Sequence, residues 1–488
     1  MKTKIPGGYV VAYNGKHHEV LEGGCVIYEG SSIIFVGFPD DPACPAAERT
    51  LHAPGRLISP GFINLHCIAN IDLQPLRIDI GAVGYPKSKA WSEADTLLWD
   101  EEEFKTSATF AVATLLRHGS TTFCNVTTMA SKRYDDPEIE PRALAEVSQQ
   151  LGVRAYLAHN FQDYSRYNSV DDKTESVYNR EAGKQGLTRA LKLVEHLRAL
   201  NDERIQPFLF PYTTETCSDD LLKEAIQAAR ALHVPIRSHF AQYAYEAKKL
   251  LSEQGMSPVE RLANLGVLGS NLTLTHAIYL RGHPDVGGGD IEADLNLLAD
   301  SGTHVGHCPI VFSRRGELLR SFQRYLEAGI NIALGTDTAP PDMIGEMRMA
   351  STMSKVADNN PESGSAAAVY NAATLGGAKA LGRADLGKLA VGAKADIAIF
   401  NLNALHIGVI DDPIKALVHY ANGADTETVI VDGKTVVEAG RVVGLAEDTF
   451  LHQAQQTWEG YKKALVARDP KARSANELYP PAFPIHKA

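Results

Sequence analysis

The chain has 488 residues, of which 44% are hydrophobic and 22% charged; these values are ordinary for a folded globular protein. Its 48 basic and 59 acidic residues give a formal net charge of −11, which argues against an electrostatic nucleic-acid binder. No apolar run approaches the roughly 18 residues of a membrane span, and no apolar signal-peptide segment is visible at the N-terminus. The six cysteines form no C-x-x-C pair, so we expect reduced thiols in a cytoplasmic protein.

The first 58 residues carry short strand-like runs, separated by glycines and by an Asn-Gly turn signal. Short strand-like runs occur again after residue 386, where residues 395–400 and 428–434 predict strands and an Asp-Gly turn. We therefore predict that residues 1–58 and 386–445 form one composite β-sandwich. The last segment, 446–488, predicts a C-terminal helix followed by a proline-rich extended arm.

Between these parts, residues 59–385 alternate strand-like and amphipathic helical stretches, which predicts an α/β fold with a parallel sheet. The strand candidates are the run that ends at His66 and residues 121–126, 154–158, 206–211, 235–239, 272–276, 305–308 and 331–335. Amphipathic stretches such as 220–232 and 292–301 lie between them. A count of about eight strands favours a closed, TIM-like (β/α)8 barrel.

Several of these strand candidates end on a side chain that can bind a metal: His66, His239, His276 and Asp337. A single histidine at the end of an apolar strand is more often a hydrogen-bonded core residue. Catalytic groups of a parallel barrel gather at the C-terminal ends of its strands, so four such endings favour a common site. Imidazole and carboxylate ligands suit Zn²⁺, Fe²⁺ or Co²⁺ with an open position for water.

The chain resembles the amidohydrolase superfamily, in the branch of the triazine hydrolases and the cytosine- or guanine-type deaminases. The resemblance rests on Ser-Pro-Gly-Phe-Ile-Asn-Leu-His at 59–66, His-Gly-Ser-Thr-Thr-Phe at 118–123, Pro-Tyr-Thr-Thr-Glu-Thr-Cys-Ser at 211–218, Ser-Gly-Thr-His-Val-Gly-His-Cys-Pro at 301–309, Ala-Gly-Ile-Asn-Ile-Ala-Leu-Gly-Thr-Asp at 328–337 and Gly-Lys-Leu-Ala-Val-Gly-Ala-Lys-Ala-Asp at 387–396. These motifs span nearly the whole chain.

The resemblance implies a role for each matching residue. His66 and His239 match metal ligands, and His276 matches the histidine that orients the hydrolytic water or polarises the substrate carbonyl. Asp337 matches the carboxylate that binds or borders the metal and shuttles the proton. Two-metal relatives carry a lysine in the stretch that corresponds to residues 206–211, where this chain has none. One divalent metal ion is therefore expected, with Zn as the first choice and Co or Fe as alternatives.

Two departures from the family pattern bear on the chemistry. The family has the pattern His-x-His where this chain has His66-Cys67-Ile68, and Ile68 cannot bind a metal. Asn70, direct ligation by His276, or water could replace the missing ligand. Deaminases and dechlorinases of this branch have the pattern His-x-x-Glu, and this chain has Gln242 in place of the glutamate, three residues after His239. An amide cannot deliver a proton.

The departures favour a substrate that already has an exposed carbonyl. We expect hydrolysis of a C–N or C–S bond next to a carbonyl, as in an amide, urea, carbamate or thiocarbamate, in a small and mostly apolar molecule. Metal-bound hydroxide would attack, with Asp337 as proton shuttle. The combination is most similar to the thiocarbamate (molinate) and phenylurea hydrolases. Two alternatives stay open: a deaminase of a heterocycle that has found another acid, and an inactive barrel kept as a scaffold.

Gln242, His307, Trp91 and His159 are the candidate substrate contacts. Trp91 lies in a long irregular region of the kind that often caps a barrel mouth, so it could line an apolar pocket. Plain packing is the alternative for His159, and a structural role is the alternative for His307. Residues 313–315, Ser-Arg-Arg, could bind an anionic group or form a solvated loop. We expect a small-molecule substrate, no nucleic-acid or membrane partner, and a homo-oligomer, the last by analogy with relatives.

Overall fold

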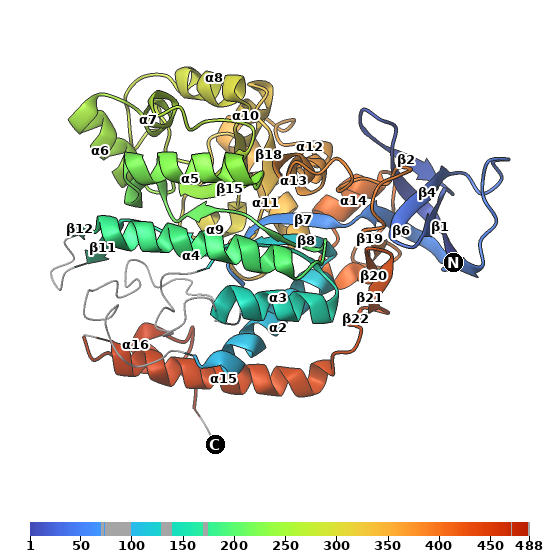
Figure 1. The fold of residues 1–488 in the computed structure, drawn as a ribbon. Helices are drawn as coiled ribbons and strands as arrows, with labels where there is room; N and C mark the ends of the chain where they lie inside the picture. The colour runs from blue at the N-terminus through green and yellow to red at the C-terminus, as the bar shows by residue number, and fades with distance from the viewer. Residues whose placement is uncertain (70–72, 74–98, 128–138, 169–173, 470, 487–488) are drawn as a thin grey trace.

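The computed structural model describes residues 1–69, 73, 99–127, 139–168, 174–469 and 471–486 (Figure 1). Within these ranges no helix has the length and apolar character needed to cross a membrane. All six cysteines are free thiols, and five of them are buried.

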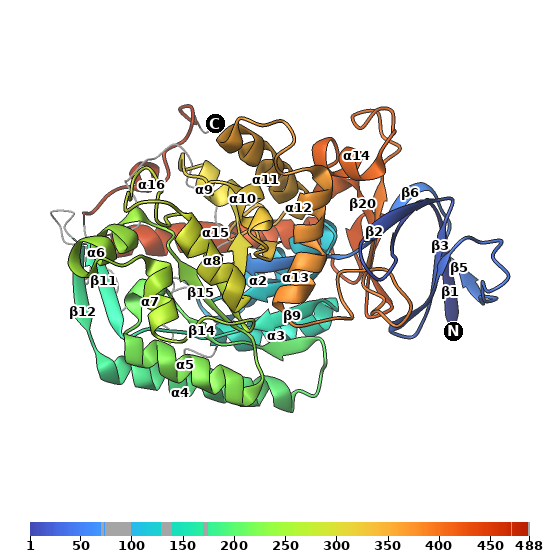
Figure 2. The same cartoon turned by 90° about the horizontal axis from the view of Figure 1, so that it is seen from above.

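Strands from both ends of the chain lie in one ten-stranded sheet at one side of the molecule (Figures 1 and 2). Its strands are β1 (Lys2–Tyr13), β2 (His18–Glu22), β3 (Cys25–Glu29), β4 (Ser32–Gly37), β5 (Arg49–Thr50), β6 (Ala53–Pro60), β19 (Ile397–Asn401), β20 (Thr426–Val431), β21 (Lys434–Glu438) and β22 (Arg441–Val442). β6 and β19 pair antiparallel, with Pro60 opposite Ile397. Buried isoleucines from both ends, including Ile5, Ile58 and Ile430, form its core.

Eight parallel strands form the centre of the molecule. One sheet has the order β13-β9-β8-β7 and the other β15-β16-β17-β18. These strands are β7 (Phe62–Cys67), β8 (Ser120–Asn125), β9 (Arg154–Leu157), β13 (Ile205–Pro207), β15 (Ile236–Phe240), β16 (Leu272–His276), β17 (His304–His307) and β18 (Ile332–Leu334). Parallel bridges join the two sheets at both edges, Cys67 with Asp337 and Leu209 with Ile236. The eight strands therefore follow one another round a ring.

The helices lie outside this ring (Figure 1). They are α2 (Glu101–Arg117), α3 (Ile139–Leu151), α4 (Arg180–Ala199), α5 (Asp219–Leu232), α6 (Ala244–Gln254), α7 (Pro258–Asn264), α8 (Glu292–Ser301), α9 (Pro309–Ser313), α10 (Phe322–Glu327), α11 (Met343–Asp358), α12 (Ala366–Ala373), α13 (Leu375–Ala380), α14 (Pro413–His419), α15 (Glu447–Arg468) and α16 (Ala475–Leu478). Helix α5 illustrates why such segments are helical. The Ser218 hydroxyl caps its start by accepting from the Leu221 N–H, and the buried residues of the helix recur at helical spacing.

The predicted strand at 206–211 differs from the structure. It is divided into β13 and β14 (Phe210–Pro211), and β14 pairs with β10 (Asn160–Phe161) instead of continuing the first sheet. Prolines at 207 and 211 lack the N–H that a ladder needs. Leu209 between them turns to the second sheet, where its N–H donates to the Pro235 carbonyl and its own carbonyl accepts from the Arg237 N–H. Strands β11 (Tyr164–Asn168) and β12 (Thr174–Tyr178) pair antiparallel in a separate two-stranded sheet.

The C-terminal helix α15 packs along α2, on the opposite side from α5 (Figure 1). Trp99 is buried there, with its ring 4.8 Å from that of Tyr461. Tyr479 packs edge-on against Trp458 at 5.0 Å. Beyond it the chain leaves the body of the protein, and Phe483 is 82% exposed.

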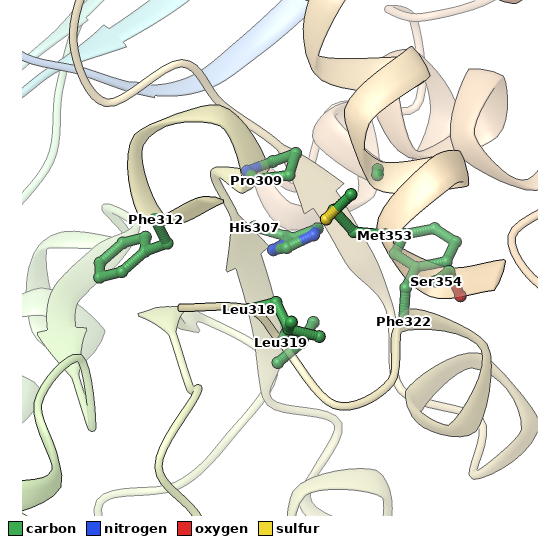
Figure 3. A pocket seen from close by; sticks show the side chains of 9 residues that line it. His307, Pro309, Phe312, Leu318, Leu319, Phe322, Met353 and Ser354 are labelled. Atoms are coloured by element: carbon green, nitrogen blue, oxygen red, sulfur yellow. The ribbon is translucent and has the colours of Figure 1, made fainter. Parts of the chain in front are cut away.

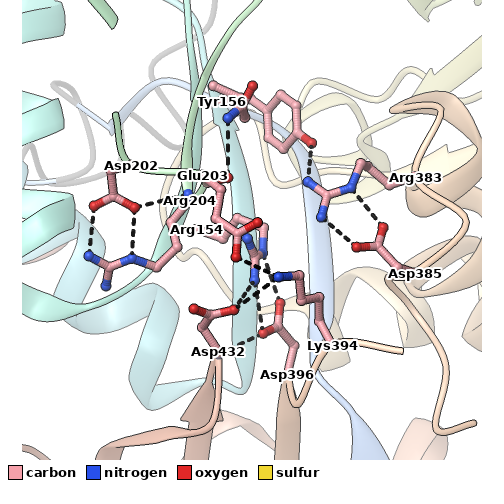
Figure 4. Close-up of polar contacts among 11 residues, drawn as sticks. Arg154, Tyr156, Asp202, Glu203, Arg204, Arg383, Asp385, Lys394, Asp396 and Asp432 are labelled. Carbon is pink, nitrogen blue, oxygen red and sulfur yellow. Dashed lines mark hydrogen bonds and ion pairs between the residues drawn. The ribbon is translucent and has the colours of Figure 1, made fainter. Parts of the chain in front are cut away.

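A buried ion pair joins the ring to the ten-stranded sheet (Figure 4). The Arg154 side chain in β9 is fully buried, and its Nε and Nη2 donate to the two Asp396 carboxylate oxygens at 3.0 and 3.2 Å. Its Nη2 also donates to Asp432 at 3.3 Å. Asp396 is the last residue of the 387–396 motif, so this motif connects the two parts of the fold through a carboxylate.

We predict that Arg154→Met destabilises the folded chain by about 3 to 5 kcal/mol, because it leaves the Asp396 charge buried without its partner. The shift of the urea midpoint measures this cost. The exposed pair of Arg324 with Glu292 offers a control, since Arg324→Met should cost only about 0 to 1 kcal/mol. Equal shifts for the two variants would contradict the structural role of Arg154.

His18, in β2, packs against Tyr370 of α12 and Thr374 just beyond it. Its Nε2 lies 3.3 Å from the Thr374 hydroxyl, and its ring packs edge-on against Tyr370 at 5.4 Å. Burial lowers the pKa of His18 from 6.5 to about 4. The neutral form thus contributes stability that is complete above about pH 6.5 and is lost as the pH falls toward 4.

We therefore predict that His18→Gln loses less stability than the parent between pH 7.5 and pH 4.5, measured as the change in denaturant midpoint. His52, which is exposed, gives the control His52→Gln, whose pH dependence should follow the parent. Parallel curves for all three proteins would show that His18 does not contribute.

Candidate metal centre

Three histidines from three different strands converge at the C-terminal edge of the ring. His66 and His239 are each the residue before the last in their strands, β7 and β15, and His276 is the last residue of β16. One ring nitrogen of each lies within 4.8 Å of the others, and all three side chains are buried. Asp337 follows β18, and its carboxylate oxygens lie 3.5 Å from His66 Nε2 and 4.0 Å from His276 Nε2.

The backbone at these strand ends adopts conformations that non-glycine residues rarely take. The φ angles are 85° at His276, 49° at Ala277, 44° at Ala241 and 56° at Asp337. Such angles cost of the order of 1 to 3 kcal/mol each and gather at functional sites. These angles turn the chain away from the strand direction at or next to the residues whose side chains face the centre.

Gly335 permits β18 to approach His66. A Cβ atom at this position would lie 2.6 Å from the His66 backbone nitrogen and 2.8 Å from its Cβ. No real side chain tolerates such distances, so only glycine lets the strand that carries Asp337 lie directly beside the strand that carries His66. The Asp337 N–H then donates to the His66 carbonyl at 2.8 Å.

His239 is oriented as a metal ligand. Its Nδ1 lies 2.8 Å from the Tyr212 carbonyl oxygen, so Nδ1 donates its proton there and Nε2 keeps its lone pair. Histidines that bind metals usually donate their other N–H to a carbonyl or carboxylate in this way. The free Nε2 faces the Nε2 of His66 at 3.1 Å.

Arg237 lies one layer below, on the same strand face as His239. It is fully buried, and its Nη2 donates to His66 Nδ1 at 3.2 Å, because a guanidinium has no acceptor. Neutral His66 then carries its proton on Nε2, toward the centre of the cluster. Binding of a cation at Nε2 requires the other neutral tautomer, with the proton on Nδ1 and the hydrogen bond from Arg237 given up.

His276 is ready to accept a ligand. Neither of its ring nitrogens has a hydrogen-bond partner among the described residues, although both are buried. Buried polar atoms without partners are rare in folded proteins. The Phe312 ring covers the same imidazole at 4.6 Å, which restricts access by water.

All three imidazoles are neutral near pH 7, as metal binding requires. Burial lowers the pKa of His239 to about 3, with a further contribution from His66. Burial also holds the pKa values of His66 and His276 well below the ordinary value, and the Arg237 cation lowers that of His66 further.

The donor set fits a divalent metal ion. Three imidazole nitrogens and the Asp337 carboxylate supply four donors of the types that Zn²⁺ and similar ions prefer. The orphaned nitrogens of His276 and the facing Nε2 atoms of His66 and His239 are what a shared ligand would satisfy. Residues 206–211 contribute no lysine to this centre.

The other candidate residues lie in different surroundings. Asn70 and Trp91 lie outside the described residues. Ile68 is partly buried among apolar side chains, and its N–H donates to the Asp337 carbonyl. His159 is buried after β9, and Gln242 is half-buried after β15; neither belongs to the three-histidine cluster.

His307 lines a small cavity beside the cluster (Figure 3). The cavity has room for about one water molecule, about 10 Å³. Leu318, Leu319 and Met353 surround the ring, and burial lowers the pKa of His307 to about 3. Phe312 borders both this cavity and His276, so His307 lies one phenyl ring away from the cluster.

Sequence reasoning missed Arg237, Tyr212 and Phe312 as neighbours of the histidines. Arg237 could have been found, because a residue two positions before His239 in a strand points to the same face. Tyr212 contributes a backbone carbonyl, for which no side-chain pattern exists. Phe312 stands in the segment 311–315, and only the fold shows that this segment folds back over His276.

Known proteins resemble the chain along most of its length. The sequence profile described as the Amidohydrolase family matches residues 57–436. The 5-methylthioadenosine/S-adenosylhomocysteine deaminase of Thermococcus kodakarensis is 31% identical over 442 residues, which cover 90% of this chain and 94% of that protein. The protein of the same name from Desulforudis audaxviator is 28% identical over 464 residues, covering 94% and 98%.

Solved structures share the fold. An adenosine deaminase from Xanthomonas campestris with bound zinc superimposes with a TM-score of 0.80 at 24% identity, covering 94% of this chain and 98% of that one. An atrazine chlorohydrolase from Arthrobacter aurescens, complexed with zinc, gives a TM-score of 0.77 at 21% identity, covering 93% and 100%. With the family profile matched over most of the chain, the protein is an enzyme that belongs to the amidohydrolase family.

Proposed function

We propose that the protein hydrolyses a C–N bond next to a carbonyl carbon in a small molecule, with one divalent metal ion at His66, His239 and His276. The observation that carries the proposal is the pairing of this cluster with a single contacting carboxylate, Asp337, among the described residues. Amides, ureas and carbamates, including phenylureas and thiocarbamates, are the substrate classes that fit such a site.

The metal supplies two things when bound: it makes a ligated water more acidic and polarises the bond under attack. The protein's own residues do the rest. Asp337 takes a proton from the attacking water and returns it to the leaving nitrogen. His276, whose ring nitrogens have no hydrogen-bond partner among the described residues, would hold the metal with His66 and His239, and Phe312 covers its ring.

The amide of Gln242 favours a substrate that is attacked at a carbonyl carbon over one that is attacked at an aromatic ring. Attack on an aromatic ring needs an acid that protonates the ring nitrogen, and an amide side chain cannot supply that proton. Without such an acid the rate falls by about 10²- to 10⁴-fold. A carbonyl oxygen needs no proton to become an oxyanion, so hydrolysis of carbonyl compounds depends less on an acid at this position.

Deamination of a heterocycle is the second candidate. It is supported by the names of the relatives, which are deaminases at 28 to 31% identity over nine-tenths of the chain. The reaction would need an acid in place of Gln242. Asp337, acting on both the water and the ring, is the described group that could serve.

A product assay on the zinc-loaded enzyme separates the two candidates. Anilides, phenylureas and aryl carbamates are tested for aniline or amine release, and aminated purines, pyrimidines and triazines for ammonia. We expect amine release from the carbonyl compounds. Ammonia release from the heterocycles without turnover of any carbonyl compound would contradict the proposal and favour the second candidate.

A further inference from the structure

The charge of the protein sets a condition on any anionic substrate. The net charge is −11, and Asp337 adds a negative group at the centre itself. A bound divalent ion would offset this charge at the centre, and a cation further out would attract an anionic group of the substrate. Arg315 is an exposed cation near this centre.

Arg315 lies one aromatic ring away from the cluster. Its guanidinium carbon is 5.7 Å from the centre of the Phe312 ring, and that ring is 4.6 Å from the His276 ring. Its Nη1 lies 3.4 Å from the Tyr243 hydroxyl oxygen, which comes from the loop after β15. Arg315 thus lies between two strand-end segments, with its side chain open to solvent.

Two carboxyl groups act electrostatically on Arg315, namely Asp337 at the centre and Glu317. Among the described residues Arg315 has no ion-pair partner, and its one hydrogen bond is the long contact with Tyr243. Glu317 is close enough to interact electrostatically, but burial raises the pKa of its carboxyl and weakens it as a counter-charge. Arg314, the preceding residue, points elsewhere, since its Nη1 donates to the Ala339 carbonyl at 2.7 Å.

We infer that Arg315 binds a carboxylate on the substrate while the scissile bond lies at the histidine cluster. The inference rests on the proposed function and adds the substrate class: a small amide, urea or carbamate that carries an acidic group. A guanidinium matches a carboxylate with two parallel hydrogen bonds. Phe312, which contacts both Arg315 and His276, supplies an apolar surface between the two ends of the substrate.

The test compares two compounds that differ only in charge, a 4-nitroanilide that bears a free carboxylate and its methyl ester. In the parent, the carboxylate compound should have a KM about 10-fold or more lower than the ester, as a charged hydrogen bond provides. Arg315→Gln should remove this difference in KM between the two compounds. Arg320→Gln, an exposed arginine of the same segment, is the matched control and should keep the parent's ratio.

Equal KM ratios in the parent and in Arg315→Gln would overturn the inference, as would a parent that prefers the ester. If neither compound is hydrolysed, the proposed function fails for this class, and equilibrium binding of the same two compounds decides the inference separately. Tighter binding of the carboxylate compound that Arg315→Gln abolishes supports it. Binding that is insensitive to Arg315 overturns it.

Discussion

Asp337→Asn is expected to lower kcat by about 10²- to 10⁴-fold, while the fold and the bound metal remain. Asparagine has the same shape, and its amide oxygen can still face His66 and His276. It cannot accept a proton from water and return it to the leaving group. The measurement is kcat together with the metal content of the same preparation, because loss of metal would give the same loss of rate for another reason.

Asp342→Asn provides the control for this variant. Asp342 lies five residues further along the chain, and its carboxylate accepts from the Ile344 N–H at the start of α11. Asparagine is an equally good N-cap residue, so kcat should stay at the parent value. If Asp337→Asn kept full activity with metal bound, Asp337 would not be the proton shuttle.

Removal of metal should abolish turnover, with a loss of at least about 10³-fold, because acidification of the attacking water accounts for several kcal/mol of the barrier. Dialysis against a strong chelator, followed by addition of Zn²⁺ or Co²⁺, tests this directly. Activity should return on addition of metal. Full activity after chelation, with no metal detected, would exclude a metal-dependent mechanism.

Histidine variants locate the metal-dependent activity. His239→Ala removes an Nε2 that the Tyr212 carbonyl has oriented toward the cluster, so chelated and metal-loaded preparations should be equally inactive. His304→Gln is the control. His304 is a buried histidine of β17 that hydrogen-bonds to the Ser270 carbonyl and lies at the other end of its strand. This variant should still regain activity when metal is added.

The candidate site could largely be predicted from the sequence because strand ends are local features. An apolar run that ends in His66, His239 or His276 marks a strand and its last residue at once. Parallel strands bring those ends to one edge, so their convergence follows from the fold class. The four residues named from the sequence are the ones whose side chains meet in the structure.

What could not be predicted depends on contacts between distant segments. The hydrogen bond from Arg237 to His66 joins residues 171 positions apart and depends on how the strands are staggered. The division of the strand at 206–211 depends on two prolines in a run that is otherwise suited to a strand. The position of Phe312 over His276 depends on α9, a helix of five residues, too short for a periodicity to reveal.

The number of metal ions bound per chain tests the account most directly. Purified enzyme is loaded with Zn²⁺, freed of excess metal and analysed by elemental mass spectrometry, beside His239→Ala and His304→Gln treated in the same way. The account predicts about one metal ion per chain in the parent and in His304→Gln, and close to none in His239→Ala. A parent that binds no metal, or a His239→Ala variant that keeps its full complement, would contradict it.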